Sequence, residues 1–137
     1  IKVFGGDQLR PNLHIKDYCD LVQILIESET NKIKNEIFNV GYQNMSINQI
    51  SLLVKKVVEN QFPEKEEIKI LKEKSDDNRS YHINSDKVKN KLGFIPKRSI
   101  ENAVEDLCKA FKNSLLLNSF DNENYFNVKK LKSIKAK

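Results

Sequence analysis

The sequence predicts an α/β fold that contains part of a parallel β-sheet. Short apolar runs typical of strands alternate with longer segments in which apolar residues recur at helical spacing. The helix that follows Ser46 lies between two such runs, residues 36–41 and 68–71. A helix that connects two buried strands is typical of a crossover in a parallel sheet. The length of 137 residues, with 39% hydrophobic and 31% charged residues, fits one globular domain with its own core.

The first part of the chain predicts two short strands and a helix. Residues 1–4 form an apolar, strand-like run that the Gly5-Gly6 pair ends. Residues 13–15 are predicted as a second short strand, and Asp17 is well placed to cap the helix after it. The apolar residues of this helix recur at helical spacing and are Tyr18, Leu21, Val22, Leu25 and Ile26.

The middle of the chain predicts a buried strand and the clearest helix. Residues 36–41, EIFNVG, form a compact apolar run closed by glycine, as in a strand that is buried on both faces. Ser46 and Gln49 match a capping box, in which each side chain accepts a hydrogen bond from the backbone of the other. The helix is predicted to end near Phe62. Its apolar stripe consists of Ile47, Ile50, Leu53, Val54, Val57 and Val58.

Shorter elements follow. Residues 68–71 alternate like a half-exposed strand, and residues 80–84 are predicted as another short strand. Ser85 opens a short helix that Gly93 stops, with Pro96 just beyond. The final helix begins at Ser99 with Asn102, and its stripe is Ile100, Ala103, Val104, Leu107 and Phe111.

After about residue 117 the sequence turns rich in asparagine and then in lysine, without any period. We therefore expect a folded region over residues 1–117 and a polar, Lys-rich C-terminal tail over residues 118–137. Residues 128–137 of this tail hold five lysines and no acidic residue, which equals the net charge of +5, so residues 1–127 are neutral overall. A basic end of this kind is typical of a solvated terminus, and no nucleic-acid-binding motif accompanies it.

Other patterns concern the compartment. No apolar run is long enough to span a membrane, and the start lacks the pattern of a signal peptide. Cys19 and Cys108 each lie within an apolar helical pattern, so we expect both to be buried free thiols in a reducing compartment. The sequence thus favours a cytoplasmic protein.

Two arginines suggest a site for a diphosphate. Arg10 precedes one predicted strand and Arg79 precedes another, each in a loop after a turn signal. A guanidinium keeps its charge and donates two N–H bonds to two oxygens, as a diphosphate requires. Taken singly, each arginine is better explained as a surface cation, and spacing does not show that they converge. The polar neighbours that would complete the site are Asn12, His14, Asn78 and Tyr81.

The other chemical candidates are weaker. His14 lies in an apolar stretch and is interpreted as a buried, hydrogen-bonded imidazole rather than a catalytic base. The histidines and cysteines show no metal-ligand spacing, so no metal site is predicted. Asp76 and Asp77 fit turn chemistry before an asparagine. Tyr125 and Lys129 match a Tyr-x-x-x-Lys pattern by chance in the polar tail.

Four stretches resemble the extended short-chain dehydrogenases/reductases, the NAD-dependent nucleotide-sugar epimerases and dehydratases. The stretch GGDQLRPNLHIKD resembles the family's Gly-x-Gly-x-x-Arg-(Asp/Pro)-x-(Leu/Ile)-(His/Tyr)-Val-x-Asp. FNVGYQNMSINQISLLV is similar to its Phe-Asn-(Ile/Val)-Gly strand and following helix. DDNRSYHINSDKVKNKLGFIP resembles Asp-x-Arg-x-Tyr-x-Ile-(Asp/Asn)-x-x-Lys-x-x-x-x-Leu-Gly-(Trp/Phe)-x-Pro, and SIENAVEDLCKAF the terminal helix. These stretches follow the family's order over about residues 1–115.

The resemblance implies a role for each matching position. Arg10 would contact the nucleotide diphosphate or the base, and Arg79 would clamp the diphosphate. Asn12 and Tyr81 would line the nucleotide-sugar pocket, and Lys87 would help to shape the lobe. The family binds NAD or NADP on an N-terminal Rossmann domain, commonly forms homodimers, and usually serves polysaccharide biosynthesis.

The chain departs from the family in two places. No glycine-rich Gly-x-x-Gly-x-x-Gly follows a strand, and no Ser/Thr with Tyr-x-x-x-Lys precedes the LRPNLHI stretch. The expected fold is therefore the C-terminal substrate-binding lobe plus the last βα crossover of a Rossmann-type parallel sheet, with further strands upstream of Ile1. No catalytic or cofactor-binding residue is assigned to this chain, which we expect to be inactive alone. The alternative is a stand-alone, non-catalytic module that binds an anion or a partner protein.

Overall fold

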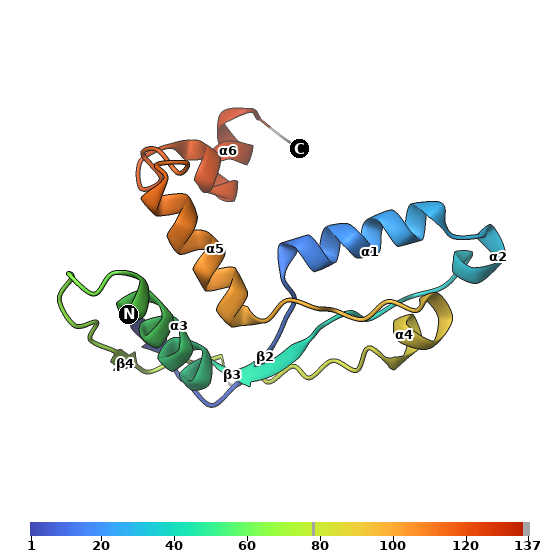
Figure 1. Ribbon diagram of the computed structural model, residues 1–137, viewed down its shortest axis with the longest axis horizontal. Coiled ribbons are helices and arrows are strands. Elements are labelled where there is room, and N and C mark those ends of the chain that lie inside the picture. Colours follow the sequence, from blue (N-terminus) through green and yellow to red (C-terminus); the bar gives the residue numbers. More distant parts are fainter. Residues whose placement is uncertain (78, 136–137) are drawn as a thin grey trace. The chain divides into compact units, whose positions relative to one another are not determined.

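The computed structural model of the chain describes residues 1–77 and 79–135 (Figure 1). The chain divides into two compact units, Ile1–Asp106 and Leu107–Lys137. Within the described ranges, no helix combines the length and the apolar character that a membrane crossing needs. The helices and strands are, in chain order, β1 (Lys2–Phe4), β2 (Leu9–Asn12), α1 (Ile15–Glu27), α2 (Thr30–Ile33), β3 (Gln43–Ser46), α3 (Ile47–Gln61), β4 (Leu71–Glu73), α4 (Asp86–Leu92), α5 (Ile100–Lys112), η1 (Glu123–Tyr125) and α6 (Asn127–Ser133).

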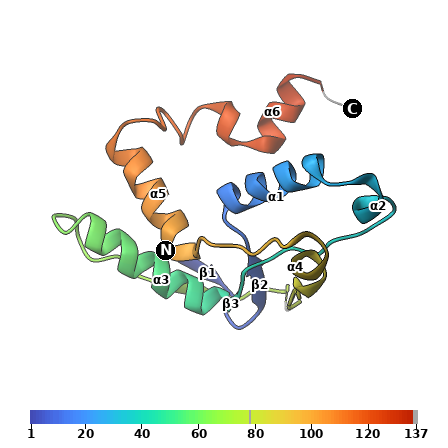
Figure 2. The same ribbon diagram turned by 45° about the vertical axis from the view of Figure 1, so that its right-hand side comes forward.

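Two small sheets organise the first unit. Strands β1 and β4 pair in parallel, with Val3 opposite Lys72. Strands β2 and β3 pair antiparallel, with Arg10 opposite Met45 (Figure 1). Helix α3 begins directly after β3 and contacts β1 (Figure 2). The mixed α/β class is thus confirmed, with a parallel pair and helices in one unit.

The predicted positions of the second and fourth strands need correction. The strand expected at residues 13–15 is wrong, because β2 occupies Leu9–Asn12 and helix α1 already begins at Ile15. This strand includes Pro11, which lacks an amide hydrogen and is tolerated because β2 has a single neighbour. The strand expected at residues 68–71 is shifted toward the C-terminus, since only its last residue belongs to β4.

Two other predicted strands are not strands in the described structure. Residues 80–84 run as a loop beside β2. The amide of Tyr81 donates a hydrogen bond to the carbonyl oxygen of Leu9 in β2 at 3.1 Å. Residues 36–41 connect α2 to β3 as an irregular segment. A run of apolar residues can be assigned to a strand only when a neighbouring strand completes its hydrogen bonds, and the described chain supplies none here.

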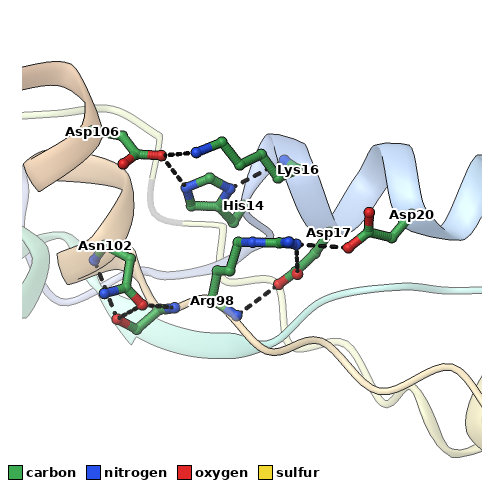
Figure 3. Close-up of polar contacts among 8 residues, drawn as sticks. His14, Lys16, Asp17, Asp20, Arg98, Asn102 and Asp106 are labelled. Atoms are coloured by element: carbon green, nitrogen blue, oxygen red, sulfur yellow. Dashed lines mark hydrogen bonds and ion pairs between the residues drawn. The ribbon is translucent and has the colours of Figure 1, made fainter. Parts of the chain in front are cut away.

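The start of helix α1 differs from the prediction. The N-cap residue is His14, whose Nδ1 accepts a hydrogen bond from the Lys16 amide at 3.1 Å. Asp17, predicted to be the cap, is instead 1% exposed inside the first turn. Its carboxylate accepts hydrogen bonds from the backbone amides of Lys97 and Arg98 at 3.0 and 2.9 Å, and from Arg98 Nη1 at 2.6 Å (Figure 3). Asp17 therefore fixes the loop before α5 to helix α1.

The other predicted helix boundaries rest on local signals, and those of α3 and α4 are confirmed. Ser46 and Gln49 form both hydrogen bonds of the capping box, and α3 ends at Gln61. Gly93 closes α4 with a φ of 68°. A core joins α1 and α4, with Leu21, Val88 and Phe94 buried in its centre and Ile24, Leu25, Phe38, Val40 and Leu92 packed around it.

The second unit holds more regular structure than the sequence predicts. Residues 118–137 are expected to be without a period, yet η1 and α6 lie within them. In this unit Lys129 Nζ lies 4.3 Å from the ring centroid of Phe126, so it interacts with that ring. Cys108 is buried as predicted, whereas Cys19 is exposed because its position on α1 faces away from the core. Both thiols are free.

Candidate functional site: a paired-arginine cluster

Arg10 and Arg79 meet at one carboxylate. Arg79 binds Asp77 at two points, with Nε 2.7 Å from Oδ1 and Nη2 3.0 Å from Oδ2. Arg10 reaches the same group from β2, with Nη2 3.6 Å from Asp77 Oδ2, and its Nη1 donates to the Arg79 carbonyl oxygen at 2.6 Å. Two side chains far apart in the sequence thus present their guanidinium groups to the same anion.

The electrostatic effect of this arrangement is strongest on Asp77. The hydrogen bonds from the Arg79 side chain and amide, together with the charge of Arg10, lower the pKa of Asp77 to about 2. In turn, the hydrogen bond to Asp77 and the charge of its carboxylate raise the pKa of Arg79 above its usual value. Arg79 is largely exposed, whereas the Arg10 side chain is 28% exposed. The cluster therefore carries a net positive charge at neutral pH and is open to solvent.

Tyr81 lies beside the arginines. The Arg10 guanidinium carbon is 5.3 Å from the centroid of its ring, a cation–π distance. The loop holds the tyrosine in place, since the Leu9 amide donates to Ser80 Oγ at 3.1 Å and the Tyr81 amide donates back to Leu9. Tyr81 is 46% exposed, so a ligand can contact it.

Asn12 has a different position from the other predicted site residues. Its Nδ2 donates to the carbonyl oxygens of Arg10 at 2.7 Å and Gln43 at 3.3 Å. The side chain thus bridges the backbones of β2 and β3 and steadies the strand that carries Arg10. Asn78, the remaining polar neighbour predicted here, lies outside the described residues.

A cavity of about 320 Å³ adjoins the cluster and is large enough for part of a small ligand. Arg10 and Asp77 line it, and Ile47 and Phe4 supply apolar walls. A neighbouring cavity of about 510 Å³ lies over the Gly5-Gly6 turn. Arg10 and Asp77 of the cluster therefore border a concave surface.

Asp77 is the member of the cluster that the sequence did not assign to the site. Its turn role is as expected, because Oδ1 accepts from the Arg79 amide at 3.2 Å and Ser75 Oγ accepts from its own amide. The Asp-x-Arg spacing is the signal that could have identified it, since it allows a side chain to fold back over its own turn.

The other chemical candidates do not join the cluster. His14 is 6% exposed, as predicted, and its Nε2 lies 3.6 Å from Asp106 Oδ2 (Figure 3). Among the described residues, no group of His, Cys, Asp and Glu side chains is arranged to hold a metal ion.

The Gly5-Gly6 turn does not fit the diphosphate of a dinucleotide cofactor. It leads into strand β2 rather than into a helix, so it lacks the converging amides of a helix N-terminus. A Cβ added at Gly5 or Gly6 would meet the side-chain end of Gln8 or Asn48 respectively. An NAD or NADP site would have to lie on other residues.

No protein-family model matches the sequence, and no curated protein matches it. Several solved structures are similar to this chain. UDP-glucose 4-epimerase from the hyperthermophilic eubacterium Thermotoga maritima, solved with UDP-glucose, is 23% identical over 84% of this chain, with a TM-score of 0.68. L-threonine dehydrogenase from Phytophthora infestans is 12% identical over 82% of this chain, with a TM-score of 0.66. UDP-glucuronic acid 4-epimerase from Bacillus cereus, solved with UDP-glucuronic acid and NAD, is 21% identical over 82%, with a TM-score of 0.63.

This chain spans 35%, 37% and 35% of the lengths of those three structures. They are two epimerases and a dehydrogenase. At such low identity the likeness concerns the fold. The chain has the fold of part of a Rossmann-like enzyme of the short-chain dehydrogenase/reductase type.

Proposed function

We propose that this chain is the nucleotide-sugar-binding part of an NAD(P)-dependent epimerase or dehydratase. The observation that carries the proposal is the convergence of Arg10 and Arg79 on the Asp77 carboxylate. In the proposed complex the diphosphate of a nucleotide-diphosphate sugar takes the guanidinium hydrogen bonds that the carboxylate now accepts. An N-terminal Rossmann domain outside these residues would bind the cofactor and carry the catalytic groups, in a homodimeric enzyme.

The chemistry of the cluster supports a diphosphate over a single carboxylate ligand. Each guanidinium can direct two parallel N–H bonds at one phosphate, so two guanidiniums suit two linked phosphates. The exposed face of Tyr81 offers a flat, partly apolar surface on which a base or a sugar can pack. The fold does not choose the substrate, because L-threonine dehydrogenases share it with UDP-sugar epimerases. The arginine pair is the feature that favours the nucleotide sugar.

The test is a calorimetric titration of the protein with UDP, UMP and uridine, and with L-threonine as the competing substrate class. We expect affinity to fall from UDP to UMP to uridine. Arg79→Ala should weaken UDP binding roughly 10- to 150-fold, because a charge-assisted hydrogen bond contributes about 1.5–3 kcal/mol. GDP and dTDP in the same series would identify the base.

Lys72→Ala is the matched control. Lys72 lies on β4 and lines the cavity over the Gly5-Gly6 turn. Its substitution by alanine removes one positive charge, as Arg79→Ala does, and leaves the arginine pair in place. Lys72→Ala should leave the affinity for UDP within about threefold of the wild-type value at constant salt, because exposed charges contribute weakly to binding. Uridine binding as tightly as UDP, or an equal loss in the lysine and arginine variants, would refute the diphosphate site.

A further inference from the structure

The second unit, Leu107–Lys137, has regular structure but almost no interior of its own. It holds the end of α5, the 3-10 helix η1 and helix α6 (red in Figure 2). Among residues 107–135, Cys108 is the only one that is buried. Six large apolar side chains beyond α5 are 53–85% exposed, namely Leu115, Leu117, Phe120, Val128, Leu131 and Ile134. So many exposed apolar side chains in one small unit indicate an interaction surface, because their contact with water is unfavourable.

Helix α6 separates its apolar side chains from its charged ones. Val128, Leu131 and the C-cap residue Ile134 follow one another at intervals of three residues, so they share one face. With a turn of about 100° per residue, Lys130 and Lys132 flank this face on its two sides. An apolar helix face bordered by lysines is typical of a helix that lies in the interface of a membrane. The long lysine stems let the ammonium groups reach the headgroups while the apolar face is buried.

The positive charge of the chain is concentrated in the same unit. The whole chain holds 24 basic and 19 acidic residues, and residues 107–137 hold 7 and 2 of them. This leaves 17 of each in residues 1–106, which are therefore neutral overall. The apolar surface thus belongs to the positively charged part of the protein. An anionic surface would attract this unit and not the rest of the chain.

The contacts within the unit keep lysines and apolar side chains together. Lys130 Nζ donates to Glu123 Oε1 at 2.9 Å, and Lys129 Nζ lies 4.3 Å from the centroid of the Phe126 ring. A second copy of the same unit would bring two positive charges together, so repulsion disfavours it as the partner. Nucleic-acid binding would use the lysines, but it would leave the aliphatic side chains without a role. A lipid surface with anionic headgroups accommodates both kinds of side chain.

We propose that the unit Leu107–Lys137 binds the surface of a membrane that contains anionic phospholipids. Its apolar side chains enter the boundary between headgroups and acyl chains, and its lysines lie against the lipid phosphates. The observation that separates this unit from an ordinary solvated basic terminus is the set of exposed leucine, valine, isoleucine and phenylalanine side chains. The proposal is independent of the arginine cluster, which belongs to the other unit.

The first test is co-sedimentation of the protein with vesicles. Vesicles of phosphatidylcholine alone are compared with vesicles of phosphatidylcholine mixed with phosphatidylglycerol, which is anionic. We expect binding to the anionic vesicles to be at least roughly tenfold tighter, and to weaken as the salt concentration rises. Absence of binding to the anionic vesicles, or equal binding to the two kinds, would overturn the proposal.

Two pairs of variants separate the apolar and the charged contributions. Leu131→Gln should weaken binding to the anionic vesicles about tenfold, because it removes one inserted apolar side chain. Its control is Ile95→Gln, since Ile95 is 54% exposed in the first unit and Leu131 is 53% exposed. Lys132→Gln should weaken binding about fivefold, and Lys72→Gln on β4 is its control. Losses in the two controls as large as those in the unit would contradict the proposed surface.

A fluorescent reporter tests insertion directly, because the chain contains no tryptophan. Phe120→Trp places an indole at the most exposed of the six apolar positions, and Ile95→Trp places one in the first unit. We expect anionic vesicles to shift the emission of Phe120→Trp to shorter wavelength and to leave that of Ile95→Trp unchanged. The same shift on raising the protein concentration without vesicles would assign the surface to a second copy. An equal shift with a DNA duplex would assign it to nucleic acid, and either result would refute the lipid surface.

Discussion

The Arg79 guanidinium and the Asp77 carboxylate form a two-point ion pair within one turn of the loop after β4, at 2.7 and 3.0 Å. Because the two residues are separated by one position, the arginine folds back over its own turn. The third contact comes from Arg10 on β2. In the proposed complex, an incoming diphosphate would have to replace the Asp77 carboxylate, so its specificity would rest on how much better two phosphates fill the two guanidinium forks.

The first prediction concerns the titration of Asp77. Its pKa in the folded protein is about 2, below the ordinary value of 3.8, because the Arg79 hydrogen bonds and the charge of Arg10 favour the carboxylate. A lowered folded-state pKa stabilises the protein above the ordinary pKa, and this contribution is lost as the pH falls toward 2. Carboxyl NMR should show the low midpoint in the wild type and a midpoint near the ordinary value in Arg79→Ala.

Arg10→Ala is the control for that titration. Its guanidinium is 3.6 Å from the carboxylate, so its removal should raise the pKa of Asp77 less than removal of Arg79 does. A wild-type midpoint at the ordinary value would show that the three side chains do not converge in solution.

The second prediction concerns the buried carboxylate of Asp17. Burial alone would raise its pKa, but the backbone amides of Arg98 and Lys97 and the Arg98 guanidinium outweigh this and lower it. Asp17→Ala leaves two backbone amides without their acceptor, so it should lower the free energy of unfolding by about 1–3 kcal/mol. Urea denaturation measures the change.

Asp20 provides a matched control, because it binds the same Arg98 Nη1 at 2.7 Å from a half-exposed position (Figure 3). Asp20→Ala should cost only about 0–1 kcal/mol, as exposed ion pairs do. Equal losses for the two variants would contradict the anchoring role of Asp17.

Most helix ends could be predicted because their signals are local, whereas most strands could not. Ser46 and Gln49 satisfy each other's backbone, and Gly93 needs only its own left-handed conformation. A strand depends on a partner far along the chain, as when Lys2 pairs with Leu71. The apolar pattern of residues 36–41 therefore indicated a strand whose pairing this chain cannot supply.

In the candidate site, too, the chemistry of single residues could be predicted from the sequence, whereas contacts between distant residues could not. Residue chemistry indicates that Arg10 and Arg79 suit a diphosphate, but only the fold brings them to Asp77. The family resemblance implies that Asn12 lines the nucleotide-sugar pocket, and this stays a prediction. Its amide also bridges two backbones, a contact that depends on the pairing of β2 with β3 and that the sequence did not indicate.

The third prediction contrasts two glycines. Both have positive φ, 138° at Gly6 and 68° at Gly93. A Cβ at Gly6 would overlap the Asn48 amide group, whereas a Cβ at Gly93 meets open space. Gly93→Ala should cost about 1–2 kcal/mol for the left-handed backbone alone, and Gly6→Ala should cost more. Thermal denaturation compares them.

The Gly6→Ala/Asn48→Ala double variant separates the two causes. If the overlap contributes, the double variant should be more stable than the sum of the two single changes predicts. Strict additivity would show that only the backbone conformation matters at Gly6.

The fourth prediction concerns the two thiols. Cys19 is exposed on α1, whereas Cys108 on α5 is 4% exposed. A chromogenic disulfide reagent should therefore modify one thiol quickly in native buffer and the other roughly tenfold or more slowly, because access limits the reaction. Cys19→Ser should abolish the fast phase, and Cys108→Ser the slow one. A fast phase that survives in Cys19→Ser would mean that α5 opens readily around Cys108, since the reagent reaches a buried sulfur only when the helix moves away.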